Sequence, residues 1–104
     1  MLAQTMTDTL VKRIVAIADP VRIILFGSYA YGTPDENSDI DLLVIKDEVT
    51  SKRRESVRLW ELLADIPIAK DIIVASRTEY DFYRGQAGSV YRTADEKGIV
   101  LYVR

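Results

Sequence analysis

Two aspartates separated by a single residue are the side chains of this sequence best placed to do chemistry. Asp39 and Asp41 stand at the start of an apolar run over residues 40–46. Side chains two positions apart in a strand project from the same face, about 7 Å apart along the chain. Two carboxylates on one face repel each other unless a positive charge lies between them. Mg²⁺ fits this pattern, because proteins commonly hold it with one or two carboxylates and the phosphates of a substrate.

A glycine–serine pair and a third acid could extend such a site. Gly27 and Ser28 follow an apolar run over residues 21–26, where glycine permits close backbone approach and the next amide groups can point at an anion. Asp71 opens another apolar run, which we expect beside the first acidic strand after a helical crossover. Three acids at one end of neighbouring strands could hold two metal ions, or one metal ion and a substrate hydroxyl to be deprotonated.

Each of these features also has an ordinary structural explanation. Asp39 could cap a strand, Asp41 could face solvent at a sheet edge, and Asp71 could be the polar first residue of a strand. The Gly27 and Ser28 pair could be a simple turn from strand to helix. Their combination is harder to explain in this way, because clustered carboxylates are costly for a fold that does not use them.

The composition excludes several classes of chemistry. The 104 residues include no Cys and no His, which excludes a zinc site of the Cys or His type, a disulfide, a thiol nucleophile and a Ser-His-Asp triad. Thr33 stands where a Walker loop needs a phosphate-binding Lys, and no Gly-x-Gly-x-x-Gly fingerprint is present. The net charge of −2 argues against general nucleic-acid binding.

Length and composition indicate one domain over residues 1–104. A content of 48% hydrophobic and 29% charged residues is typical of a globular domain with one real core. The apolar runs are far shorter than the roughly 20 residues of a membrane span, and the N-terminus lacks the basic and apolar segments of a signal peptide. We therefore expect a cytoplasmic protein with no membrane partner.

Hydrophobic periodicity predicts the elements that must position the acids. Apolar residues at helical spacing predict helices over residues 7–18, 51–64, 77–84 and 89–97. Runs rich in β-branched residues predict strands over residues 21–26, 40–46, 70–75 and 99–103. A polar loop over residues 33–38 should connect the first two strands. This order predicts an α/β or α+β domain with a mixed sheet of about four strands flanked by helices.

Particular residues are expected to begin or end these helices. Thr7 or Asp8 would cap the first helix, and Asp19 followed by Pro20 would end it. Gly98 would end the last helix as a left-handed C′ residue. Pro67 would end the second helix, whose apolar stripe is predicted to contain Val57, Leu59, Trp60, Leu62, Leu63 and Ile66.

The spacing of the glycine–serine pair and the acids resembles a known family. Gly27-Ser28, ten intervening residues and Asp39-Ile40-Asp41, with Asp71 on a later strand, are similar to the signature of minimal nucleotidyltransferase domains of the DNA polymerase β superfamily. The resemblance covers about residues 10–103 and implies a mixed sheet with flanking helices. It also implies ATP as substrate and one or two Mg²⁺ ions as cofactors. The implied nucleotide-binding residues are Gly27, Ser28, Gly32 and Ser38. The implied catalytic and metal-binding residues are Asp39, Asp41 and Asp71.

The resemblance further implies a partner protein. Short members of the family are similar to antitoxins encoded beside HEPN-domain toxins, some of which transfer AMP from ATP to a tyrosine of the toxin. This implies a hetero-oligomer or another oligomer. The chain departs from the family in one place, because Tyr31 occupies a position where many relatives carry Arg. A guanidinium pairs with phosphate more strongly than a phenol does, so Tyr31 bears on the affinity for triphosphate.

Two alternatives to this function remain open at the sequence level. The chain could be an inactive subunit of the same fold that neutralises a toxin by binding it. It could also modify a small molecule such as an antibiotic, although relatives of that kind carry additional domains for the acceptor. The basic residues of the second predicted helix could compensate for Tyr31, dock an acidic partner or simply face solvent; they are Lys52, Arg53, Arg54 and Arg58.

Overall fold

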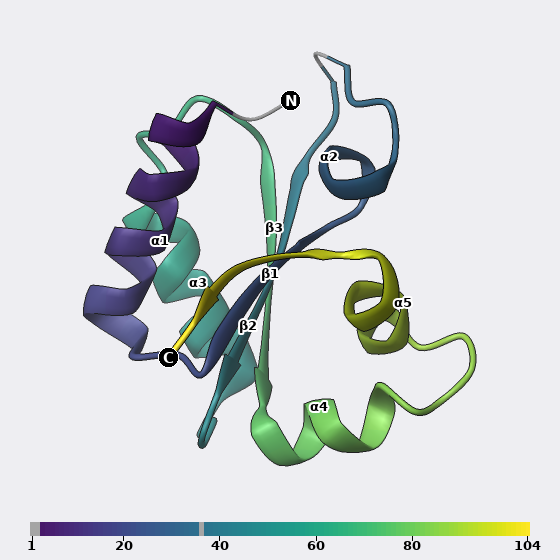
Figure 1. The fold of residues 1–104 in the computed structure, drawn as a ribbon. Coiled ribbons are helices and arrows are strands. Elements are labelled where there is room, and N and C mark those ends of the chain that lie inside the picture. The colour runs from purple at the N-terminus through teal and green to yellow at the C-terminus, as the bar shows by residue number, and fades with distance from the viewer. Residues whose placement is uncertain (1–2, 36) are drawn as a thin grey trace.

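Four strands form one mixed sheet at the centre of the molecule (Figure 1). The computed structural model describes residues 3–35 and 37–104. The strands are β1 (Arg22–Phe26), β2 (Ile40–Lys46), β3 (Lys70–Ser76) and β4 (Ile99–Val103). The helices are α1 (Gln4–Ala18), α2 (Ser28–Tyr31), α3 (Lys52–Leu62), α4 (Arg77–Tyr83) and α5 (Val90–Lys97). The predicted fold class is therefore confirmed.

The strand order is β3-β2-β1-β4, with β1 antiparallel to both β2 and β4. Strand β2 is parallel to β3, and α3 makes the crossover that a parallel pair requires. In this register Asp41 lies beside Asp71 on the neighbouring strand and beside Phe26 on β1. The end of β1 and the starts of β2 and β3 consequently meet at one end of the sheet.

Helices cover both faces of the sheet, so the molecule has three layers (Figure 1). One face packs against α1 and α3, where Leu10 and Leu59 join Ile23 of β1 in a buried cluster. The other face packs against α4 and α5, where Tyr80 and Tyr91 lie with alternate residues of the same strands. Because each central strand is buried on both faces, its sequence reads as a continuous apolar run. Within the described residues, no helix has the length and apolarity needed to cross a membrane.

The helix ends agree only in part with the sequence prediction. Helix α1 ends at Ala18, and its C-cap residue Asp19 has a left-handed backbone with φ 44°, so the predicted stop at Asp19 and Pro20 is confirmed. The prediction that Thr7 or Asp8 caps α1 is wrong, because the helix begins at Gln4 and Ala3 holds the N-cap position. Helix α3 is capped by the Ser51 hydroxyl, which accepts a hydrogen bond from the Arg54 amide.

The predicted apolar stripe of α3 is also wrong in part. Leu59, Leu63 and Ile66 are buried against the sheet. Val57 and Trp60, however, are 46% and 50% exposed. The reason is that α3 contacts the sheet only through the side that carries Leu59. The helix also ends at Leu62, well before Pro67. Val57 and Trp60 therefore form an exposed apolar surface on the outer side of α3.

Gly98 ends α5 for a different reason from the one predicted. Its φ is −71°, so the left-handed conformation expected of a C′ glycine is absent and that prediction is wrong. A Cβ at this position would lie 2.4 Å from the Ala94 carbonyl oxygen and 2.5 Å from Cγ2 of Ile24. Glycine is needed here because α5 and β1 approach each other too closely for a side chain.

We expect Gly98→Ala to destabilise the protein by about 1–3 kcal/mol, as overpacking of a well-filled core does. Urea unfolding followed by circular dichroism measures this change. Gly85→Ala is the matched control, since the nearest atom to its new Cβ would lie at an ordinary contact distance of 3.7 Å. Equal unfolding free energies for the two variants would contradict the packing explanation.

Candidate active site

The sheet brings three of the predicted site residues together at one end. Gly27 directly follows β1, and Asp41 lies opposite the last residue of that strand. Asp71 stands beside Asp41 in parallel register, so both side chains lie on the same face of the sheet. Asp39 is exposed and precedes β2 by one residue. The crossover from β2 to β3 is thus what places the third acid beside the first two.

Gly27 and Asp41 are in intimate contact. The backbone of Gly27 has φ 76°, a left-handed conformation that favours glycine. A Cβ on Gly27 would lie 2.0 Å from Oδ2 of Asp41, closer than two atoms can approach without a bond. The carboxylate of Asp41 therefore occupies the space that any other residue at position 27 would fill, directly beside the start of α2.

The electrostatic environment of Asp41 is unfavourable to its own charge. Partial burial raises the pKa of Asp41, and repulsion from Asp71 and then Asp39 raises it further. All donors in this cluster are carboxylate oxygens, which suit a hard cation such as Mg²⁺. Within the described parts of the chain, no three acidic side chains converge into a set that could hold a metal ion. A cation here would thus need further ligands, such as the phosphates of a substrate.

The short helix α2 shapes the other side of this cluster. The Gly27 carbonyl accepts hydrogen bonds from the amides of Ala30 and Tyr31, and the Gly32 amide closes the turn on the Ser28 carbonyl. No backbone partner is found for the amides of Ser28 and Tyr29 within residues 3–35 and 37–104. These two amides remain available to an anion placed beside the Asp41 carboxylate.

The structure places the remaining predicted nucleotide-binding residues less directly. Gly32 ends α2, where a Cβ would lie 2.9 Å from Cα of Ser28, so its role visible here is to permit a tight turn. The Ser38 hydroxyl accepts a hydrogen bond from the Asp35 amide and donates one to the Asp35 carboxylate. Ser38 therefore holds the loop that leads into Asp39 and β2.

Sequence reasoning missed one cation near α2. Lys97 is the last residue of α5, and its Nζ lies 5.9 Å from the centroid of the Tyr31 ring. Cations over aromatic rings at this distance are attracted to the ring. The two residues are far apart in the sequence, so no local pattern could have associated them.

A shallow depression of about 180 Å³ adjoins the cluster on the β3 side. It contains Asp71 together with the exposed Val57 and Trp60 of α3. The Lys70 ammonium lies 6.0 Å from the Trp60 ring centroid and donates a hydrogen bond to the Ile66 carbonyl. Because β3 is an edge strand, this side of the carboxylate cluster is open to a second molecule.

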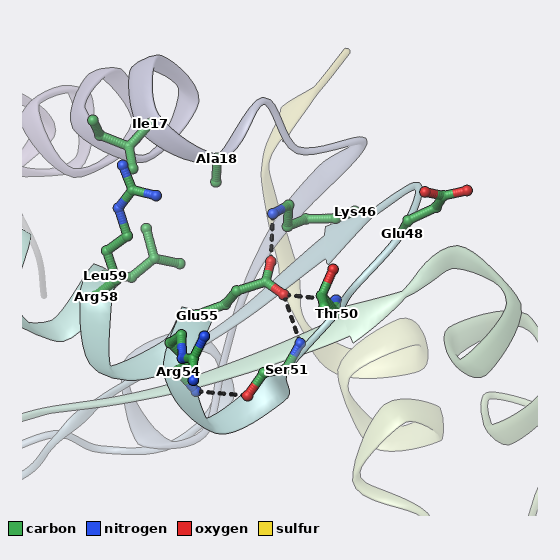
Figure 2. Close-up of a pocket in the computed structure, with 10 residues that line it drawn as sticks. All are labelled: Ile17, Ala18, Lys46, Glu48, Thr50, Ser51, Arg54, Glu55, Arg58 and Leu59. Atoms are coloured by element: carbon green, nitrogen blue, oxygen red, sulfur yellow. Dashed lines mark hydrogen bonds and ion pairs between the residues drawn. The ribbon is translucent and has the colours of Figure 1, made fainter.

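A separate cavity of about 350 Å³ lies between α1 and α3, at the Lys46 end of β2 and away from the acids (Figure 2). Inside it the Glu55 carboxylate accepts hydrogen bonds from Lys46 Nζ and from the amides of Thr50 and Ser51. Burial opposes the charge of Glu55, but these donors hold its pKa below the ordinary value. The guanidinium of Arg58 extends toward Ile17 of α1 (Figure 2).

The fold and the carboxylate cluster together define the class of the protein. A mixed four-stranded sheet with a glycine–serine turn beside paired aspartates is the arrangement expected of a minimal nucleotidyltransferase domain. The model of the family described as "Nucleotidyltransferase domain" matches residues 8–100, and the chain belongs to this family. The resemblance noted from the sequence is thereby confirmed.

Two curated relatives come from Methanocaldococcus jannaschii and are named as candidate protein adenylyltransferases. The first is 35% identical over 54 residues, which make up 52% of this chain and 54% of the relative. The second is 57% identical over 35 residues, or 34% of this chain and 24% of the relative. The matches thus span about half and about a quarter of the lengths of these two proteins.

Solved structures with the same fold include two toxin–antitoxin complexes. One, determined with AMP-PNP, has a TM-score of 0.71 at 23% identity and covers 94% of this chain and 73% of that chain. The MntA-HepT complex has a TM-score of 0.66 at 19% identity over 98% of this chain and 74% of that chain. A candidate nucleotidyltransferase from Sulfolobus solfataricus has a TM-score of 0.65 at 18% identity over 96% of this chain and 79% of that chain. At these identities the likeness shows the fold.

Proposed function

We propose that the chain is a Mg²⁺-dependent nucleotidyltransferase that transfers AMP from ATP to a tyrosine hydroxyl of a partner protein in the cytoplasm. The partner would be a HEPN-domain toxin, and the chain would be its antitoxin. The observation that carries the transferase assignment is the Asp41 carboxylate, held against Gly27 and repelled by Asp39 and Asp71. Relatives solved as toxin–antitoxin complexes, one of them with AMP-PNP, support a nucleotide substrate and a toxin partner.

Each residue of the cluster would have its own role in the reaction. The Ser28 hydroxyl and the amides of Ser28 and Tyr29 would orient the β- and γ-phosphates. Asp39 and Asp41 would hold Mg²⁺, which when bound neutralises charge on the triphosphate. Asp71 would accept the proton of the acceptor hydroxyl, a task that falls to a carboxylate because the chain has no His. The hydroxyl oxygen then attacks the α-phosphorus and pyrophosphate leaves.

The position of Asp71 also indicates the side from which the acceptor arrives. Asp71 lies on the open edge strand and lines the depression beside Val57 and Trp60. The Gly27 turn lies on the opposite side of Asp41, toward β1. The nucleotide and the acceptor would thus approach Asp41 from opposite sides, as a displacement in line at phosphorus requires.

Transfer of label from α-³²P-ATP in a lysate of the source cells tests this function. We expect a labelled protein band with Mg²⁺ and the wild-type chain, and none with the Asp39→Asn/Asp41→Asn variant. The size of the band would identify the acceptor. Label in a small-molecule fraction instead would favour antibiotic-type modification, and no transfer to any fraction would contradict transferase activity.

The second candidate function is neutralisation of the partner by binding alone. The observation in its favour is the cavity between α1 and α3, where the exposed guanidiniums of Arg54 and Arg58 form no ion pair within the described residues. Together with the apolar Ile17 and Leu59 they would suit an acidic segment of a partner. Full neutralisation of the toxin by the Asp39→Asn/Asp41→Asn variant would establish this alternative.

A further inference from the structure

The proposed triphosphate site carries an excess of negative charge. Asp71 and Asp39 already repel the charge of Asp41 there, and a triphosphate adds further negative charge. Catalysis of phosphoryl transfer depends largely on positive groups that neutralise such charge. The chain therefore needs a cationic side chain near the Gly27–Ser28 turn in addition to any bound Mg²⁺.

Lys97 is positioned to supply that charge. Its Nζ lies 5.9 Å from the ring centroid of Tyr31, which belongs to the same short helix as Ser28. The side chain of Lys97 is exposed and forms no ion pair within residues 3–35 and 37–104. An exposed lysine without an acidic partner is available to an incoming anion.

Two other cations of the strands are occupied or distant. Lys70 adjoins Asp71, but its ammonium donates to the Ile66 carbonyl and faces Trp60 on the β3 side. Arg22 stands at the far end of β1, four residues before Phe26. Lys97 is thus a cation that the fold brings to the β1 side of the carboxylate cluster.

The tertiary structure holds Lys97 at this place. A Cβ built on Gly98 would lie 2.5 Å from Cγ2 of Ile24 and 3.0 Å from the Leu25 carbonyl oxygen, so the end of α5 packs closely against the end of β1. Helix α5 is further fixed by the Tyr80 hydroxyl, which donates to Asp95. Burial, followed by this hydrogen bond, raises the pKa of Tyr80 to about 12, so the phenol remains a donor at neutral pH. Figure 1 shows the end of α5 on the same side of the sheet as α2.

We propose that Lys97 is a nucleotide-binding residue that contacts the β- or γ-phosphate of the bound triphosphate, with the Tyr31 ring as its support. This inference rests on the proposed function. The flexible stem of lysine lets its ammonium leave the ring and reach a phosphate oxygen when a nucleotide binds. An ammonium–phosphate contact is a charge-assisted hydrogen bond, among the stronger polar contacts that proteins form.

Equilibrium binding of a fluorescent ATP analogue, with unlabelled ATP and AMP as competitors in Mg²⁺, tests the proposal. We expect Lys97→Ala to weaken ATP binding about tenfold or more, as loss of a charged hydrogen bond does, and to change AMP binding less than twofold. Lys97→Arg should retain most of the ATP affinity. Tyr31→Arg in the Lys97→Ala background should restore it, because the new guanidinium would stand beside the same phosphates.

Arg53→Ala is the matched control, since Arg53 is an exposed cation in the first turn of α3, which follows the Lys46 end of β2 and not the end that carries the acids. An unchanged ATP affinity in Lys97→Ala would overturn the inference, and so would equal weakening by Arg53→Ala. Equal loss of ATP and AMP binding with a lower melting temperature would assign Lys97 a structural role and overturn it as well. Failure of the wild-type chain to bind nucleotide would instead overturn the proposed function and this inference with it.

Discussion

Asp41→Asn is expected to lower the rate of nucleotidyl transfer roughly a thousandfold while leaving the fold intact. The substitution keeps the shape of the side chain that fills the space beside Gly27. It removes the negative charge that would hold Mg²⁺ against the triphosphate, and about 4 kcal/mol of lost transition-state stabilisation corresponds to this factor. Single-turnover transfer from α-³²P-ATP to the identified acceptor measures the effect.

Asp81→Asn is the matched control, because Asp81 is an exposed carboxylate on α4, away from the cluster. Its rate should equal that of the wild type. If Asp41→Asn retained more than a tenth of the wild-type rate, Asp41 could not be the principal metal ligand. Other residues would then have to hold the metal ion.

The Asp41→Asn variant should have a higher free energy of unfolding than the wild type at neutral pH in the presence of EDTA. Because burial and the neighbouring acids raise the pKa of Asp41, the native state binds its proton more tightly than the unfolded chain does. Wild-type stability therefore falls as the pH rises through the raised pKa of the native state. Asparagine carries no charge and avoids this loss.

Melting curves across pH measure this difference. We expect the melting temperature of Asp41→Asn to exceed that of the wild type at pH 7.5. The gap should shrink as the pH falls and vanish below the ordinary Asp pKa of 3.8, where Asp41 is protonated in both states. A variant less stable than the wild type at pH 7.5 would show that the carboxylate stabilises the fold, contrary to the repulsion described here.

Gly27→Ala is expected to damage both the fold and the reaction. Alanine at φ 76° and ψ −159° is strained by about 1–3 kcal/mol, and its Cβ would lie 2.0 Å from Oδ2 of Asp41. The carboxylate or the turn must move, so we expect a total destabilisation of about 2–4 kcal/mol. We also expect at least a roughly hundredfold loss of transfer rate, because misplacement by 1 Å has such effects in active sites.

The Gly88→Ala variant distinguishes the two causes of the destabilisation, which are backbone strain and the clash of the new Cβ with Asp41. Gly88 also has a positive φ, 82°, but among the described residues no atom beyond its chain neighbours lies within 4 Å of a Cβ built there. Gly88→Ala should thus show only the backbone strain of about 1–2 kcal/mol in urea unfolding, with a normal transfer rate. Similar losses of stability and of transfer rate in the two variants would indicate that the contact between Gly27 and Asp41 contributes to neither.

Much of the fold follows from local patterns that the sequence shows directly. The four strands were predicted from short runs of apolar, β-branched residues, and the longer helices from apolar residues at helical spacing. The parallel register of Asp41 and Asp71 agrees with the predicted helical crossover. Helix α2 was missed, since four residues are too few to display a helical period.

Other features could not be predicted, because they depend on distances between elements. The exposure of Val57 and Trp60 depends on how α3 lies on the sheet, and the same helical spacing would suit a buried stripe. Gly98 was assigned the wrong reason, since its sequence position fits a C′ glycine while the close approach of Ile24 is visible only in three dimensions.

The sequence by itself determined the chemistry that is available and the elements that carry it. Absence of His and Cys, the pair Asp39 and Asp41, and the Gly27–Ser28 turn limit the site to carboxylates, amides and hard cations. Only the tertiary structure decided that the Asp41 carboxylate fills the space beside Gly27 and that Lys97 stands over Tyr31. The physical reason is that charge and periodicity are local properties of a chain, whereas contacts between distant residues arise only when packed layers bring strand and helix ends together.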